Sequence, residues 1–437
     1  MATNTRTNEL SFGEPEQFAS SFSSLSKGLK GSRILQIAGQ VRELIAAGET
    51  VYNLTVGDFD PSMFPIPAGY KDRIKAALDD GQTTYPPADG MPELRAAVAE
   101  YASRVWNVPF QPVNAIIGGG ARPMIFATYK ALINPGEKVV YPVPSWNNHY
   151  YTTIADANVA QLETVPENGF MPTLDDLAPH MKDARLLVLN TPSNPTGTVI
   201  DPEMLRAITQ GIVDENLRRA EKDQPRLFLL MDMVYHALVF GDHRHVHPLE
   251  LVPAAAPWVI SLDAVSKGFC GTGVRVGWGL AAPAVIAKLK PLISHMGAWA
   301  PRAEQVALAG FLRDREAVES FQDHLVAGVG ERLDTLYKGF ADMKADGYPV
   351  ECIAPEGAVF LSLRLNWIGK NMDGKAMESN EDIRTLLLEK SGMAVVPFQA
   401  FGRAAEDGWF RMSVGAVTSD NIRGMFPKVR ALMDGMR

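Results

Sequence analysis

Cysteine is scarce in this chain. The 437 residues include only two cysteines, Cys270 and Cys352. Two thiols exclude a disulfide-stapled scaffold and a cysteine-rich zinc site, and they favour reduced thiols in a cytoplasmic protein. His243, His245 and His247 alternate in a polar segment, but an arginine stands among them, so we expect no metal site there.

Long apolar runs and an excess of positive charge are also missing. No stretch approaches the roughly 20 apolar residues of a membrane-spanning helix, so no membrane partner is expected. The formal net charge is −8 at pH 7, whereas general nucleic-acid binders are usually basic, so nucleic acid is not an expected partner. Residues 1–32 are polar, without the apolar core of a signal peptide. We expect this segment to be an arm, either disordered or wrapped around a partner.

The rest of the composition is that of an ordinary globular protein. Hydrophobic residues make up 46% of the chain and charged residues 21%, and the length allows two domains. Helical spacing of apolar residues predicts one helix over residues 34–48 and another over 91–101. Five short apolar runs then alternate with helical segments, at 115–117, 138–141, 185–189, 226–231 and 259–262. Strands separated by helices predict an α/β fold with a mostly parallel sheet covered on both faces.

The patterning divides the chain into four segments. Beyond about residue 303, helices are followed by short strand-like pieces, which indicates a smaller α+β domain. Residues 214–224 are charged and are expected to extend a surface helix. The expected division is an arm at 1–32, a helix and strand joining the small domain at 33–58, a large domain at 59–305 and a small domain at 306–437.

The predicted strands of the large domain lead into residues that can take part in chemistry. In parallel sheets, ligands bind beyond the carboxyl ends of the strands. The last two runs lead to Asp232 and Lys267. A lysine at the mouth of a buried strand, beside a second cation at Arg275, has a lowered pKa and becomes a nucleophile near neutral pH. A buried carboxylate at Asp232 needs a cation, either from the protein itself or from the ring nitrogen of a bound pyridine.

Further polar residues follow the same strands. Tyr235 and Asn194 can donate hydrogen bonds to one ligand. The glycines at 118–120 open a helix whose free N–H groups suit a phosphate, and a plain tight turn explains them about as well. Trp146 suits either stacking on a flat ring or core packing. Arg411 interrupts an apolar strand and needs an anion, and its guanidinium fork matches a carboxylate.

Together these residues resemble the class I and II aminotransferases, pyridoxal-phosphate enzymes of fold type I that include aspartate aminotransferase. The resemblance extends from about residue 32 to the end of the chain. The motifs that carry it are Ser-Asn-Pro-Thr-Gly at 193–197, Asp232 with Tyr235, Ser266-Lys267 with Arg275, and Arg411. It implies a large α/β domain with a mostly parallel seven-stranded sheet covered by helices, plus a smaller α+β domain.

The resemblance also implies roles. Lys267 is expected to bind pyridoxal 5'-phosphate as a Schiff base and, once released, to move the substrate proton. Asp232 is expected to keep the ring nitrogen of the cofactor protonated. Tyr235 and Asn194 would bond the ring oxygen, and Trp146 would cover the ring. The residues expected around the phosphate are Gly120, Ala121, Arg122, Ser266, Arg275 and, from a neighbouring subunit, Tyr85.

The match at the tyrosine implies a homodimer with shared sites. Arg411 and the backbone of Gly57 are expected to hold the α-carboxylate of the substrate. The expected reaction is transamination between an L-amino acid and a 2-oxo acid by a ping-pong mechanism. Aspartate and glutamate are favoured and aromatic amino acids come next, with Arg302 or Arg122 as the reader of a distal carboxylate. A lyase or decarboxylase with the same cofactor is the alternative, and a non-catalytic regulator is less favoured.

Some residues depart from the family pattern. Ala264 stands three residues before Lys267, where the family often has serine or threonine, so one hydroxyl for the phosphate is missing. Phe398 and Gln399 replace smaller residues after a strand of the small domain, and we expect them to reshape the side-chain pocket. Cys270 has no histidine partner in sequence, so we expect it to pack near the site rather than act as a nucleophile.

Overall fold

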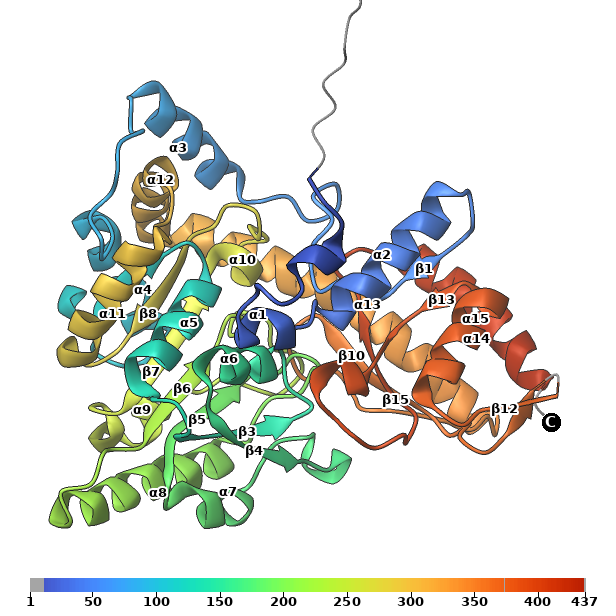
Figure 1. The fold of residues 1–437 in the computed structure, drawn as a ribbon. Coiled ribbons are helices and arrows are strands. Elements are labelled where there is room, and N and C mark those ends of the chain that lie inside the picture. Colours follow the sequence, from blue (N-terminus) through green and yellow to red (C-terminus); the bar gives the residue numbers. More distant parts are fainter. Residues whose placement is uncertain (1–11, 373, 436–437) are drawn as a thin grey trace, which may run out of the picture.

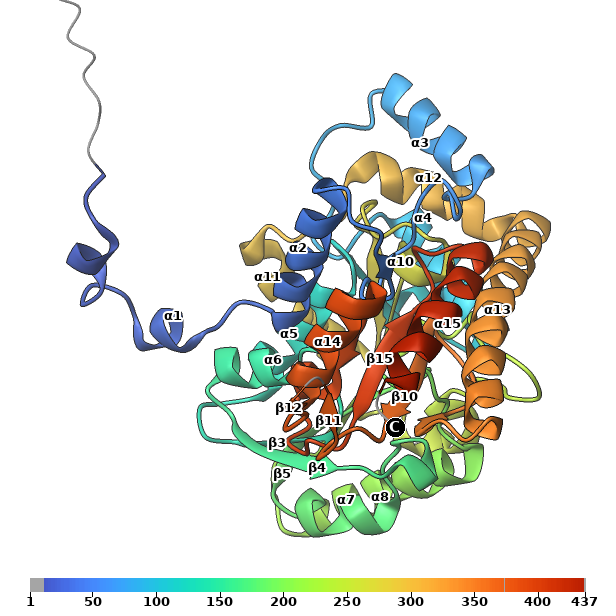
Figure 2. The same cartoon turned by 90° about the vertical axis from the view of Figure 1, so that its right-hand side faces the viewer.

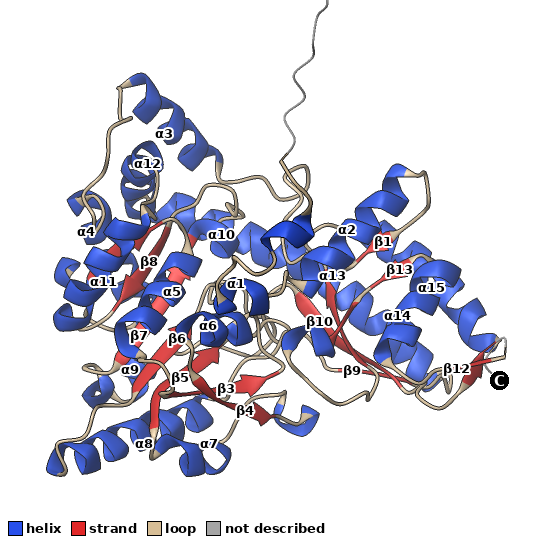
Figure 3. Cartoon of the chain, viewed as in Figure 1, coloured by secondary structure: helices blue, strands red, loops and turns tan. Residues whose placement is uncertain are grey.

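The computed structural model describes residues 12–372 and 374–435. Two sheets, one in each of two lobes, form its framework (Figure 1; strands are red in Figure 3). The N-terminal segment with η1 (Pro15–Phe18) and α1 (Ser24–Gly28) extends away from both lobes (Figure 2). Within the described ranges, no helix is both long and apolar enough to cross a bilayer.

The sheet of the large lobe has seven strands in the order β2-β8-β7-β6-β5-β3-β4. Only β8 runs antiparallel to its neighbours, which confirms the predicted mostly parallel sheet. The five predicted runs are β2, β3, β5, β6 and β7. The prediction missed β4, an exposed edge strand, and β8, which is short and half glycine. The strands are β2 (Ala115–Gly118), β3 (Lys138–Val143), β4 (Asn158–Glu163), β5 (Ala184–Asn190), β6 (Phe228–Asp232), β7 (Val259–Ala264) and β8 (Gly277–Leu280).

Alternating side chains bury both faces of this sheet. Leu229 and Met231 of β6 face one core and Leu230 faces the other. Each such side chain contributes about 1.5–3 kcal/mol on full burial, so the strand is held from both sides. The first core includes residues of α4 (Pro92–Trp106), α7 (Leu174–Met181), α8 (Pro202–Glu221) and α12 (Arg302–Arg313). The second includes residues of α5 (Ala121–Leu132), α6 (Asn148–Ala155) and α11 (Pro283–Met296).

The small lobe has an antiparallel sheet in the order β14-β15-β10-β9. Its strands are β9 (Val350–Cys352), β10 (Phe360–Leu365), β14 (Val396–Pro397) and β15 (Trp409–Ser413). The helices around it are α13 (Arg315–Ala345), α14 (Asn380–Ser391) and α15 (Ser419–Asp434). The N-terminal helix α2 (Arg33–Ala46) leads into β1 (Tyr52–Asn53), which pairs in parallel with β13 (Met393–Ala394). The predicted helices at 34–48 and 91–101 are confirmed as α2 and α4.

Helices α12 and α13 lie where the chain passes from the large lobe to the small lobe. The expected boundary between residues 305 and 306 falls inside α12, which packs on α3 (Ala68–Asp79) in the large lobe. Helix α13 then contributes Val318 to the core of the large lobe and Leu325 to that of the small lobe. The division into four segments stays a prediction. The charged stretch at 214–224 does extend a helix, because α8 continues to Glu221.

Candidate active site

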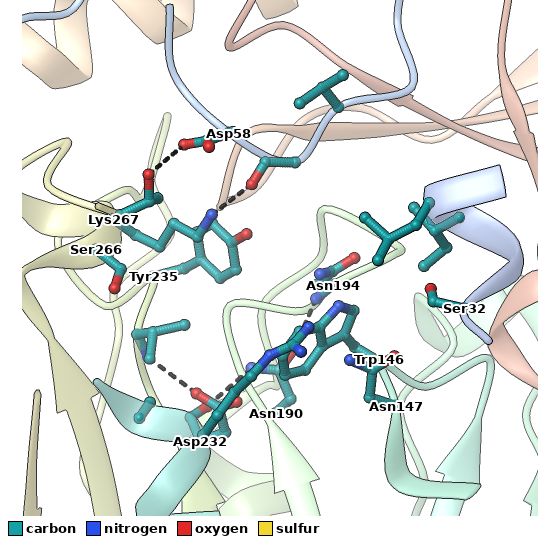
Figure 4. A pocket seen from close by; sticks show the side chains of 18 of the residues that line it. Ser32, Asp58, Trp146, Asn147, Asn190, Asn194, Asp232, Tyr235, Ser266 and Lys267 are labelled. Atoms are coloured by element: carbon teal, nitrogen blue, oxygen red, sulfur yellow. Dashed lines mark hydrogen bonds between the residues drawn. The ribbon is translucent and has the colours of Figure 1, made fainter. Parts of the chain in front are cut away.

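A cavity of about 350 Å³ lies at the carboxyl ends of the central strands, between the two lobes (Figure 4). The large lobe contributes Asp232 from the end of β6 and Lys267 from just beyond β7. The small lobe contributes Arg411 from β15, and the start of α2 closes one side with Ile34 and Leu35. Of the residues predicted for the site, all line this cavity except Gly120 and Tyr85.

Lys267 lies in the single turn α10 (Val265–Gly268), directly after the buried strand β7. Its Nζ donates to the carbonyl oxygen of Gly57 and lies 5.6 Å from the centre of the Tyr235 ring. Burial lowers the pKa of Lys267 to about 8, Asp58 opposes this, and Arg411 adds to it. The predicted lowering is therefore confirmed, but its cationic contributors are Arg411 and then Arg122 rather than Arg275.

Asp232 has no cationic side chain at ion-pair distance in the described part of the chain. Its Oδ1 accepts a hydrogen bond from the Val234 amide at 3.2 Å, and the side chain is buried. Burial raises the pKa of Asp232 to about 6, partly offset by that amide bond and by Lys267. The prediction allowed a partner within the protein or a ring nitrogen from outside it. The geometry suits the second, because a buried carboxylate without a cation is costly.

Tyr235 and Asn194 flank the space above Asp232. Burial raises the pKa of Tyr235 well above its usual value, so its phenol keeps its proton and remains a donor. The Oδ1 of Asn194 accepts a hydrogen bond from Arg411 Nη1 at 3.0 Å, so its amide NH₂ points to other acceptors. Asn190 holds this loop in place: its Oδ1 accepts from the Asn194 amide at 2.7 Å. Its Nδ2 donates to the Asp232 carbonyl at 3.0 Å.

The start of α5 and the loop after Lys267 meet at one end of the cavity. Arg275 bonds the carbonyl oxygens of Thr272 and Gly119, both at 2.7 Å. Gly120 precedes the helix with a positive φ of 96°, and a Cβ there would overlap Arg275. The Gly120 amide donates to the Gly118 carbonyl. Ala121, the next residue, is the first residue of this helix that lines the cavity. The helix N-terminus and the guanidinium together favour an anion such as a phosphate.

Arg411 is a buried cation without a carboxylate partner in the described ranges. The side chain is 1% exposed, its Nη2 donates to the Thr55 carbonyl at 2.5 Å, and its Nε has no hydrogen-bond partner. The guanidinium lies 4.6 Å from the ring centre of Phe360 and 4.8 Å from that of Phe401. Burial lowers the pKa of Arg411 to about 10, which leaves it charged at neutral pH. A buried guanidinium placed in this way suits an incoming carboxylate.

Arg122 and Tyr85, both predicted for the site, differ in whether they line the cavity. The Arg122 guanidinium stacks over the ring of Trp146, with 4.6 Å between them, and both line the cavity. Tyr85 lies outside the cavity with 82% of its surface exposed, and its ring packs on Trp299 at 5.3 Å. Arg302 lies beside it, bonded to Gln82 Oε1 at 2.8 Å, and does not line the cavity of its own chain.

Other sequence-based expectations have clear outcomes. Phe398 packs on Phe170 at 5.3 Å, and Gln399 bonds the side chain of Asn380. Neither lines the cavity, so the expectation that they reshape the side-chain pocket is wrong. Cys270 is buried and burial raises its pKa to about 12, which suits packing rather than nucleophilic chemistry.

The histidine segment is less polar than its sequence indicates. His247 is fully buried, with its Nε2 2.7 Å from Ser261 Oγ and its Nδ1 accepting from the Leu249 amide. Within residues 12–372 and 374–435, no three histidine, cysteine, aspartate or glutamate side chains are grouped for a metal ion.

Among the polar cavity residues that the sequence-based prediction missed are Asp58 and Thr272. Asp58 stands next to the predicted Gly57, and Thr272 stands between Lys267 and Arg275. Their side chains bond each other at 2.8 Å across 214 positions of sequence. Adjacency to predicted residues was the available signal, but the contact itself depends on the tertiary fold.

Known proteins resemble the chain over most of its length. The sequence profile of the family "Aminotransferase class I and II" matches residues 49–425. Aspartate aminotransferase of Pyrococcus horikoshii is 28% identical over 399 residues, which cover 90% of this chain and 94% of that protein. Aspartate/prephenate aminotransferase of Cereibacter sphaeroides is 28% identical over 421 residues, covering 93% and 97%. The structure of aspartate aminotransferase from Thermus thermophilus with maleate matches with a TM-score of 0.83 at 25% identity, covering 94% and 99%.

The chain therefore belongs to the class I and II aminotransferases. It is a pyridoxal-phosphate-dependent enzyme that transfers an amino group between an amino acid and a 2-oxo acid. This confirms the predicted family, fold type, cofactor and reaction, and it disfavours the lyase, decarboxylase and regulator alternatives. The cavity fits the cofactor, because it holds a lysine of lowered pKa, a buried carboxylate that pairs with no cation of the described residues, and a helix N-terminus beside Arg275.

Proposed function

We propose that this cavity is the active site and that its residues have the roles expected from the sequence. Pyridoxal phosphate, when bound, supplies an aldehyde that captures amines and a ring that withdraws electrons. The observation that carries the proposal is the pairing of Lys267, a lysine of lowered pKa, with Asp232, a buried carboxylate without a cation, in one cavity.

The residues proposed to hold the cofactor line one cavity. Lys267 would bind its aldehyde, Asp232 would pair with its ring nitrogen, and Trp146 would stack on its ring. Tyr235 and Asn194 would donate to its ring oxygen, because the Tyr235 phenol stays protonated and the Asn194 amide is free to donate. Ser266, Arg275 and the amides of Ala121 and Arg122 would hold its phosphate, and Gly120 permits the close approach of Arg275.

Lys267 is also the proposed proton carrier. Its amine is neutral above a pKa of about 8, so near neutral pH both the neutral and the charged form are available. The neutral Nζ accepts the proton that the substrate α-carbon loses, and the ammonium holds that proton for return. A general base whose pKa lies near the working pH serves both halves of a ping-pong cycle.

Arg411 is the proposed site for the α-carboxylate of both substrates, together with the backbone of Gly57. The buried guanidinium already bonds Thr55 and Asn194 and has no carboxylate of its own in the described ranges. A substrate carboxylate there completes a buried charge pair.

Arg122 is the proposed reader of a distal carboxylate. It lines the same cavity as Lys267 and Arg411, whereas Arg302 does not. We therefore favour L-aspartate and L-glutamate as amino donors, with 2-oxoglutarate as acceptor. The similar structure from Thermus thermophilus contains maleate, which carries two carboxylates. Ile34 and Leu35 add an apolar wall, so aromatic amino acids are the proposed second substrate class.

A homodimer with shared sites is the proposed assembly. Tyr85 is the supporting residue, because an aromatic side chain that is 82% exposed and rests on Trp299 is available to a second copy. Its phenol would then reach the phosphate in the partner's cavity. The free thiols at Cys270 and Cys352 agree with the proposed cytoplasmic location.

A coupled assay tests the reaction and its substrates. Enzyme loaded with pyridoxal phosphate is given L-aspartate and 2-oxoglutarate, and oxaloacetate and glutamate are measured. We expect both products in equal amounts, with aspartate turned over at a higher kcat/KM than phenylalanine. Pyruvate and ammonia formed without an acceptor would instead identify a lyase, and equal kcat/KM values would reject the dicarboxylate preference.

A further inference from the structure

Asp58 is a cavity carboxylate to which the proposed function gives no role. It belongs to the segment 54–60, which connects β1 to the large lobe, and residues 55–58 of this segment line the cavity; Asp58 lies opposite Asp232 (Figure 4). Its Oδ1 accepts two hydrogen bonds, from Thr272 Oγ1 and from the Phe59 amide, each at 2.8 Å. Both bonds fix the direction in which the carboxylate points.

The segment that carries Asp58 contacts the main cations of the cavity. The carbonyl of Thr55 accepts from Arg411, and the carbonyl of Gly57 accepts from Lys267. A backbone hydrogen bond joins this segment to the small lobe, since the Ser413 amide donates to the Leu54 carbonyl oxygen at 2.8 Å. A short stretch of chain therefore links the proposed carboxylate site to the loop that carries the lysine.

Charged and titratable groups from several elements surround Lys267. Arg411 of β15 and Arg122 of α5 disfavour its ammonium form. Tyr235 presents the face of its ring, and Asp232 lies at the end of the neighbouring strand. Cys270 follows in the same loop. Among these groups, Asp58 contributes the most in favour of the ammonium form, although it forms no direct ion pair with Lys267 in the described part of the chain.

We propose that Asp58 is a positioning residue of the aminotransferase reaction, which offsets Arg411 and Arg122 so that Lys267 can both release and hold a proton. The hydrogen bond from Thr272 holds the carboxylate in the same cavity as Lys267, and the two side chains form no ion pair in the described part of the chain. This inference rests on the proposed role of Lys267. It assigns a function to two cavity residues that the cofactor and the substrate carboxylate do not require.

Lys267 must adopt two forms during the reaction, a neutral amine and an ammonium. A lysine surrounded only by arginines and apolar walls would stay neutral and would hold the transferred proton poorly. A lysine in direct contact with a carboxylate would stay charged and would be a poor base. A carboxylate that is tethered nearby, in a cavity of low dielectric, gives an intermediate balance.

Asp58→Asn tests the charge without removing the contacts, because the amide oxygen can still accept from Thr272 and Phe59. The full chain without cofactor is labelled with acetic anhydride between pH 6 and pH 10.5, and acetylation of Lys267 is followed by peptide mass spectrometry. Exposed Lys71 of α3 is the internal reference. We expect the titration midpoint of Lys267 to fall by roughly one pH unit, at the lower end of what an opposite charge contributes. Labelling at pH 7 then becomes faster.

Asp58→Glu and Thr272→Val are the matched variants. Asp58→Glu keeps the charge and should restore the wild-type midpoint, whereas Thr272→Val frees the carboxylate and should give a smaller downward shift. In the loaded enzyme, the basic group in the pH profile of kcat should move in the same direction in Asp58→Asn, with KM less affected. If Asp58→Asn does not fold, the other two variants carry the test.

An unchanged midpoint in Asp58→Asn, or in Thr272→Val where only that variant folds, overturns the inference. The proposed function fails in a different way. It fails if borohydride reduction of the loaded wild-type enzyme leaves no pyridoxyl group on Lys267. An enzyme that carries the label on Lys267 but shows no response to Asp58 therefore rejects this inference alone.

Discussion

Lys267→Met should make the protein more stable when no cofactor is bound. In the folded chain, burial and neighbouring cations lower the pKa of Lys267 from its ordinary 10.5 to about 8. A lowering of this size corresponds to about 3 kcal/mol of unfolding free energy at pH values where the lysine is charged in both states. Methionine is of similar length and carries no charge, so it removes this penalty.

Two effects reduce the expected gain. The amine faces the cavity, where water screens part of the charge. The variant also loses the hydrogen bond to the Gly57 carbonyl, which contributes about 1 kcal/mol. We therefore expect a net gain of about 1–2 kcal/mol at pH 7.

The pH dependence gives the sharper signature. A lysine whose pKa is lowered on folding destabilises the protein fully below pH 8. The penalty declines as the pH rises from about 8 to 10.5, because the unfolded chain binds one more proton than the folded chain across this window. The stability difference between Lys267→Met and wild type should therefore shrink over this window.

Urea unfolding of both proteins without cofactor, at pH 7 and at pH 10.5, measures the difference. Lys71→Met, on the exposed side of α3, is the control for replacing a surface lysine by methionine. A variant no more stable than wild type at pH 7, or one with the same gain at both pH values, would show that the Lys267 ammonium does not destabilise the fold.

Three further substitutions test the proposed roles. Arg411→Ala should lower kcat/KM, mainly through a higher KM, with a loss of transition-state stabilisation of about 2–5 kcal/mol, because it removes one partner of a buried charge pair. An unchanged KM would contradict this role. Arg364→Ala, on the adjacent strand, is the control. Asp232→Asn should weaken cofactor binding, measured by fluorescence titration, and should slow turnover strongly, because a neutral amide cannot form a charge pair with a protonated ring nitrogen; cofactor binding and turnover like wild type would remove Asp232 from the mechanism. Arg122→Ala should reduce the preference for aspartate over phenylalanine about 10- to 100-fold, the worth of one charged hydrogen bond; a preserved preference would point to Arg302 instead.

The sequence predicts the framework well because buried parallel strands have continuous apolar runs. The runs that became β5, β6 and β7 are fully packed on both faces, and their ends carry Asn194, Asp232 and Lys267. Strands β4 and β8 escaped prediction for physical reasons. The first is an exposed edge and the second has glycine at alternate positions, so neither shows the apolar pattern.

The site is less predictable wherever it depends on contacts between distant segments. The lowered pKa of Lys267 follows from burial, but the cations that act on it come from α5 and β15, far away in sequence. Phe398 stands beside residues of the cleft in sequence, yet it turns into a cluster with Phe170 and Trp409. Thr272 and Asp58 meet only through the folding of the chain between the lobes.

All the proposed roles depend on covalent attachment of the cofactor to Lys267. The purified protein is loaded with pyridoxal phosphate, reduced with borohydride, digested and examined by mass spectrometry. We expect a single modified peptide, with the pyridoxyl group on Lys267, and no such product in Lys267→Met. A label on another lysine, or none at all, would rule out this attachment.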